Sequence, residues 1–210
     1  HAGPEIGVAS TKAFTCQLAV LFMMTLKAAQ DKSIISEINF VKIVQDLKSL
    51  PSTLSQYLGS TCSITDIAHK LSTASDVLFL GRGLMYPLAL EGALKLKEIS
   101  YIHAEGYAAG ELKHGPIALI DDSVPVVILA PCDELFEKNM SNMQEVIARK
   151  ANVVLISEKE GLQSASSMVE NSIEMPQANK LLTPLVYALP MQLLAYFTAL
   201  SKGTDVDQPR

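Results

Sequence analysis

The chain has 210 residues, of which 49% are hydrophobic and 19% charged, so it can bury a sizeable core and is not a disordered tail. Its net charge of -5 and its pI near 5.4 argue against a nucleic-acid partner, because that would call for a basic face. Three cysteines, Cys16, Cys62 and Cys132, lie far apart and outside any metal-ligand spacing, which favours a reduced, cytoplasmic protein. The opening residues predict no signal peptide, and the lack of an initiator methionine suggests a fragment of a longer protein.

The first predicted helix, about residues 10–27, is apolar around most of its circumference. Its unbroken apolar run, Leu18 to Met24, is far shorter than the roughly 20 residues of a membrane span, so we expect a buried or subunit-interface helix and no membrane partner. Ser10 and Thr11 stand where a helix N-cap would, and a hydroxyl there could satisfy a free backbone amide. Alternatively, the turn Val8-Ala9-Ser10 presents its amides and hydroxyl to a ligand.

Residues 34–74 predict two or three amphipathic helices, at about 36–49, 53–57 and 63–72, with Pro51 separating the first two. No linker rich in glycine, serine or proline divides this region, so we expect the junction between domains to be helical. We place it near Ser60. Residues 1–60 would be the end of a first domain with its helical connection, and residues 61–210 a second domain with the start of a C-terminal tail.

The stretch from Val77 to Ile120 contains the strongest indication of a site. A buried strand at 77–80 precedes the turn Gly81-Arg82-Gly83 and a long helix over about 84–100. This order places backbone amides and a helix N-terminus at the carboxyl edge of a parallel sheet, where such sheets bind ligands.

Polar residues on this helix and in the following loop could carry acid–base chemistry. Glu91, Lys95 and Glu98 are spaced i, i+4 and i+7 and share one stripe of the helix, which could also be an ordinary solvated face. His114 lies in the polar turn 110–116. A carboxylate and an imidazole, if the fold brings them together, can act as general acid and base near neutral pH.

The rest of the chain alternates strands and helices. Apolar runs at 125–130, 153–157 and 172–175 predict strands, and helices are expected at about 134–150 and 184–201. This alternation predicts an α/β fold, with a parallel sheet between helices in a three-layer αβα arrangement.

Three ordered segments identify a resemblance. They read EIGVASTKAF at 5–14, ALEGALKLKEISYIHAE at 89–105 with GELKHGP at 110–116, and KGTDVDQPR at 202–210. They closely resemble the isomerase part of the glucosamine-6-phosphate synthase family, also called glutamine:fructose-6-phosphate aminotransferases (isomerizing). The resemblance implies a fold of the sugar isomerase (SIS) type and an enzyme of amino sugar and UDP-GlcNAc biosynthesis. It would convert fructose 6-phosphate to glucosamine 6-phosphate with ammonia from a separate glutaminase domain.

The resemblance also implies roles for individual residues. Glu98 matches the base that moves a proton from C1 to C2, which a carboxylate can do without a metal or cofactor. His114 matches the residue that assists ring opening across the subunit interface, so a homodimer is expected. Lys95 matches a lysine that lines the site; the alternative is a helix-surface ion pair. The loop Val8-Ala9-Ser10 matches a wall of the sugar phosphate site.

Parts of the family's machinery are missing from this sequence. The phosphate-binding loop would precede His1, the Schiff-base lysine would follow Arg210, and the glutaminase domain is absent, so we expect the fragment not to run the full reaction alone. Because the family binds the phosphate with that loop, Arg82 is expected to stabilise the turn Gly81-Arg82-Gly83 and not to bind phosphate. An alternative function is a non-catalytic SIS module that binds a sugar phosphate for regulation. Another SIS enzyme, such as a sugar-phosphate deaminase or deglycase, is a further alternative.

Overall fold

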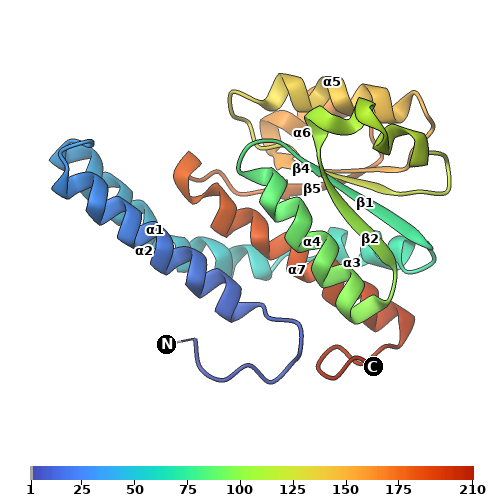
Figure 1. The fold of residues 1–210 in the computed structure, drawn as a ribbon, viewed down its shortest axis with the longest axis horizontal. Helices are drawn as coiled ribbons and strands as arrows, with labels where there is room; N and C mark the ends of the chain where they lie inside the picture. The colour runs from blue at the N-terminus through green and yellow to red at the C-terminus, as the bar shows by residue number, and fades with distance from the viewer. Residues whose placement is uncertain (1) are drawn as a thin grey trace.

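The computed structural model describes residues 2–210 and has a parallel sheet between layers of helices (Figure 1). Its five strands are arranged in the order β2-β1-β3-β4-β5, and every neighbouring pair is parallel. The strands are β1 (Asp76–Gly81), β2 (His103–Ala108), β3 (Val126–Leu129), β4 (Val153–Glu158) and β5 (Asn171–Met175). The predicted α/β fold with a three-layer parallel sheet is confirmed.

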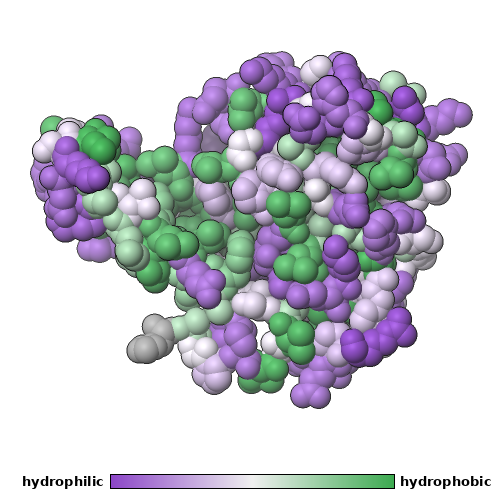
Figure 2. Space-filling view, in the orientation of Figure 1, coloured by the Kyte–Doolittle hydropathy of each residue, from purple (hydrophilic) through white to green (hydrophobic). Residues whose placement is uncertain are grey.

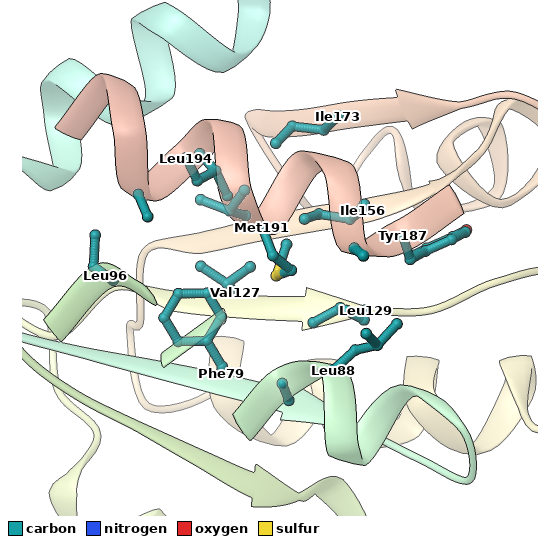
Figure 3. Close-up of a cluster of buried hydrophobic side chains, with 14 of the residues drawn as sticks. Phe79, Leu88, Leu96, Val127, Leu129, Ile156, Ile173, Tyr187, Met191 and Leu194 are labelled. Carbon is teal, nitrogen blue, oxygen red and sulfur yellow. The ribbon is translucent and has the colours of Figure 1, made fainter. Parts of the chain in front are cut away.

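Two hydrophobic cores separate the helices into layers. On one face, Phe79, Val127 and Ile156 pack around Met191 (Figure 3). The helices on this face are α3 (Cys62–Leu71), α4 (Met85–Ser100) and α7 (Thr183–Lys202). The opposite face is covered by α5 (Phe136–Ile147), α6 (Lys159–Ala165) and the 3-10 helix η1 (Ala109–His114). Two further 3-10 helices are η2 (Pro116–Leu119) and η3 (Lys180–Leu182). Strands β3 and β4 are buried on both faces, which explains their continuous apolar sequences.

Helices α1 (Lys12–Asp31) and α2 (Glu37–Leu58) form a hairpin that extends away from the sheet (Figure 1). Leu26 is the one fully buried residue of α1, whereas Leu21 and Met24 are 60% and 64% exposed. Apolar side chains are visible on the surface of this hairpin (Figure 2). Within the described residues 2–210, the prediction that α1 is a buried core helix is therefore wrong. The alternative, that α1 lies at a subunit interface, stays a prediction.

Two segments are long and apolar enough to cross a membrane by length and composition alone. They are α1 and the segment Lys180–Lys202, which includes α7. The apolar window of the second is 61% buried within the protein, as expected for a core helix, and that of α1 is 6% buried.

Helix α2 corrects the predicted break at Pro51, because it is continuous from Glu37 to Leu58. Ile43 and Leu50 are buried before the proline, and Leu54 packs on the core after it. One apolar face thus spans the proline and favours a continuous helix despite the lost amide donor. The proposed domain boundary near Ser60 falls between α2 and α3 and stays a prediction.

Candidate active site

The helix that carries the candidate residues begins immediately after the central strand β1. Gly81 ends that strand, and a Cβ atom there would lie 2.3 Å from the carbonyl oxygen of Met85. Gly83 follows with a φ of 54°, a conformation that glycine adopts without steric cost. Two glycines therefore allow the sharp turn that places α4 against the sheet.

The polar stripe of α4 is largely buried. Lys95 Nζ lies 2.6 Å from Glu98 Oε2 and 3.8 Å from Glu91 Oε1. The side chains of Lys95, Glu91 and Glu98 are 6%, 13% and 30% exposed, so the stripe is not a solvated surface. Burial raises the pKa of Glu91, and the nearby Lys95 opposes that shift. The arrangement fixes the Glu98 carboxylate by a charge-assisted hydrogen bond and leaves it partly accessible, as a proton-transferring base requires.

Lys95 lines a cavity of 290 Å³ that four segments of the chain enclose. Ile99 continues the wall along α4, Gln192 and Tyr196 come from α7, and the remaining walls are residues 5–12 and 206–207. Glu98 does not line the cavity itself. Its carboxylate forms an ion pair with Lys95, which does. The cavity thus joins residues 5–12 and 206–207, from the two ends of the chain, to the charged stripe of α4.

The predicted loop Val8-Ala9-Ser10 lies at this cavity, but its members differ in position. Ala9 lines the cavity, whereas Val8 and Ser10 do not. The side chain of Val8 points to solvent, with 64% of the residue exposed, and its amide donates a 2.9 Å hydrogen bond to the carbonyl of Asp207. The loop is therefore tied to the C-terminal turn.

The predicted N-cap position of α1 is confirmed for Thr11, but the predicted capping hydrogen bond does not form. Neither the Thr11 nor the Ser10 side chain accepts a hydrogen bond from the first turn. Instead, Glu5 Oε1 accepts hydrogen bonds from the amide of Ala13 at 2.8 Å and from Ser10 Oγ at 3.3 Å. Glu5 also lines the cavity. Sequence reasoning missed this residue because it lies well outside the spacing of a helix cap.

His114 is not near Glu98 within one chain. It ends the 3-10 helix η1 rather than lying in an irregular loop, and its side chain is exposed. Ala109 and Leu112 anchor η1 in the core on the face of the sheet opposite to α4. A shared site for His114 and Glu98 would therefore need a second copy of the chain.

Arg82 stabilises the turn that follows β1, as expected. Its Nε and Nη2 atoms donate hydrogen bonds to Asn142 Oδ1 at 3.0 and 2.8 Å, which joins the turn after β1 to helix α5. Across residues 2–210, no three His, Cys, Asp or Glu side chains are grouped closely enough to hold a metal ion.

Comparisons with known proteins identify the family and the fold of this chain. A family model described as "SIS domain" matches residues 70–202. Curated proteins named glutamine--fructose-6-phosphate aminotransferase [isomerizing] align over the whole chain: that of Brucella abortus is 56% identical over 209 residues, and that of Zymomonas mobilis 57% identical over 210. The chain spans only about a third of their length, 34% and 35% respectively.

Solved structures show the same fold. The C-terminal domain of glucosamine-fructose-6-phosphate aminotransferase from Francisella tularensis superimposes with a TM-score of 0.91 at 45% identity, over 98% of this chain and 58% of that one. A glucosamine-6-phosphate deaminase from Thermotoga maritima has a TM-score of 0.58 at 22% identity, over 93% of this chain and 54% of that one, and so shares the fold alone.

Proposed function

Given that this chain belongs to the SIS domain family, we propose that it is the isomerase part of a glutamine--fructose-6-phosphate aminotransferase. The substrate would be fructose 6-phosphate and the product glucosamine 6-phosphate. The observation that carries this proposal is the pair of the buried Lys95 with the partly accessible Glu98 beside the cavity. A binding module would have no need of a carboxylate fixed by a largely buried lysine that lines a cavity, because burying a charge is costly.

Glu98 is the proposed base of the isomerisation. It would take a proton from C1 of the sugar and return it at C2, with one carboxylate serving both carbons. Lys95 supports this role in two ways. Its ammonium group fixes one carboxylate oxygen at 2.6 Å, and it supplies a positive charge at the cavity where negative charge develops on the sugar.

The loop Val8-Ala9-Ser10 is the proposed wall that holds the sugar phosphate. Ala9 lines the cavity directly. The bonds of Glu5 to Ser10 and to the first turn of α1 hold the loop in one conformation. A preformed wall of this kind lowers the entropic cost of binding a flexible polar substrate.

His114 is proposed to complete the site from the other subunit of a homodimer, where it would assist ring opening. Its exposure, and its location on the face of the sheet opposite to α4, support a role in trans. The glutaminase domain of the full-length protein would supply ammonia. We place the protein in the cytoplasm, with no nucleic-acid or membrane partner. Its reaction would belong to the route of amino sugar biosynthesis that leads to UDP-GlcNAc.

Proton exchange at C1 of fructose 6-phosphate in deuterated water, followed by NMR, tests this function. The full-length protein is used, because the chain spans a third of its relatives. We expect Glu98→Gln to abolish exchange, and Glu134→Gln, an exposed glutamate paired with Lys180, to leave it unchanged. Tight binding of the sugar without exchange in the wild-type protein would instead establish a regulatory binding module.

A further inference from the structure

The turn formed by residues 203–210 is tightly anchored beside the cavity. Thr204 Oγ1 donates to the carbonyl of Ile99 at 2.6 Å, which fastens the turn to the end of α4. Asp205 Oδ1 accepts hydrogen bonds from the amides of Asp207 and Gln208, both at 2.9 Å, which fixes the shape of the turn. Val206 and Asp207 then form a wall of the cavity that contains Lys95.

Tyr101 contacts the far end of this turn in two ways. Its hydroxyl accepts a hydrogen bond from the backbone amide of Arg210 at 2.7 Å. The guanidinium carbon of Arg210 lies over the tyrosine ring, 4.4 Å from its centroid, within the range of a cation–π interaction. The two contacts use different parts of both residues and can therefore be removed separately.

The backbone of Tyr101 is unusual for a bulky residue. It ends α4 in the left-handed conformation, with φ 62° and ψ 14°, where glycine is the common choice. A tyrosine is disfavoured there, because its Cβ atom crowds the backbone. The tyrosine side chain is thus present despite a steric cost, and its contacts with Arg210 offset that cost.

We propose that Tyr101 is a positioning residue, which clamps the turn 203–210 so that Val206 and Asp207 close the cavity beside Lys95. Tyr101 lies three residues after Glu98 on the same helix terminus, so the clamp sets the cavity wall in register with the proposed base. This role rests on the proposed function for its substrate, but the ordering of the turn does not depend on it.

Three variants of the full-length protein separate the clamp from the fold. Tyr101→Phe removes the hydrogen bond and keeps the ring. Tyr101→Gly removes both contacts and relieves the left-handed strain, so its thermal midpoint should match or exceed that of wild type. Tyr86→Phe is the control, because Tyr86 lies on the same helix outside the cavity lining.

The readouts are amide hydrogen exchange of residues 203–210 and the kinetics with fructose 6-phosphate. We expect exchange at Arg210 and KM to rise about fivefold in Tyr101→Phe, as for one lost hydrogen bond. Both should rise further in Tyr101→Gly, with kcat changing less than KM. The control should change neither.

An unaltered KM in Tyr101→Gly overturns the proposal, as does unaltered exchange in the turn. If the wild-type protein does not turn over fructose 6-phosphate, the proposed function fails. Exchange alone then decides the clamp: faster exchange in a well-folded Tyr101→Gly protein supports it, and wild-type exchange overturns it.

Discussion

The carboxylate of Glu5 accepts a 2.8 Å hydrogen bond from the backbone amide of Ala13, so a residue in the loop before α1 caps the first turn of that helix. We expect Glu5→Ala to destabilise the protein by about 1 kcal/mol, the usual cost of losing a helix cap. Ser10→Ala should cost less, because the Ser10 hydroxyl only donates to Glu5. Urea denaturation compares the two variants, and equal losses would contradict the assignment of the cap.

Lys95→Met should be severely destabilising. The change leaves the carboxylates of Glu91 and Glu98 close together without their cation, and breaking such a largely buried pair costs about 3 kcal/mol. The pKa of Glu91, already raised by burial, should rise further without the lysine that lowers it. Urea denaturation and NMR titration of the Glu91 carboxyl measure the two effects.

The matched control is Lys27→Met. Lys27 pairs with Asp31 one helical turn away, but both side chains are about 60% exposed, so we expect a change below about 0.5 kcal/mol. Similar losses for Lys27→Met and Lys95→Met would show that the α4 stripe is solvated in solution.

Gly106→Ala should destabilise the contact between strand β2 and helix α4. A Cβ atom at Gly106 would lie 2.7 Å from the amide nitrogen of Leu90 and 2.8 Å from the carbonyl of Ala89. Because both neighbours are backbone, the strand must move away from the helix, at a cost of about 2 kcal/mol. At Gly59, a right-handed helix end with φ -73°, a Cβ atom would lie 3.3 Å from the carbonyl oxygen of Gln56, so Gly59→Ala should cost less, about 0.5 kcal/mol. Thermal unfolding of both variants decides, and a loss confined to Gly59→Ala would refute this packing.

His103 should titrate above its ordinary range. Its Nδ1 atom lies 2.7 Å from Asp76 Oδ1, and this hydrogen bond is the largest cause of its raised pKa, with Glu105 adding to it. The folded pKa exceeds the unfolded one, so the stabilisation is complete below about pH 6.5 and is lost as pH rises through the folded pKa. The pair is exposed, so the effect should stay below about 0.5 kcal/mol.

NMR titration of the imidazole checks this directly. Asp76→Asn should move the midpoint of His103 to lower pH. Asp66→Asn, on the neighbouring helix α3, should leave it in place. A midpoint that does not respond to Asp76→Asn would remove the proposed cause.

Much of the sheet could be predicted because β1, β3 and β4 are unbroken apolar runs, which is typical of buried parallel strands. Strand β2 was missed because its sequence, HAEGYA, alternates titratable residues with alanine and glycine. Its place in the sheet is fixed by pairing with β1 along its whole length and by the small residues that allow α4 to approach. Those contacts are long-range and leave no local pattern.

The site was predictable only in part. Helical spacing placed Glu91, Lys95 and Glu98 on one stripe, but the cavity that Lys95 lines is completed by α7 and the turn at 206–207, which are distant in sequence. The two contacts of Glu5 connect residues with no helical periodicity between them. No spacing could have revealed them.

The hydrogen bond from the amide of Val8 to the carbonyl of Asp207 has a consequence for biosynthesis. The walls of the cavity come from residues near both positions, whereas all five strands lie between them. During translation the sheet can therefore assemble before the cavity exists, and a ribosome must release residues 206–207 before the cavity can close. A released chain truncated ahead of Val206 would hold a nearly complete hydrophobic core and no competent pocket.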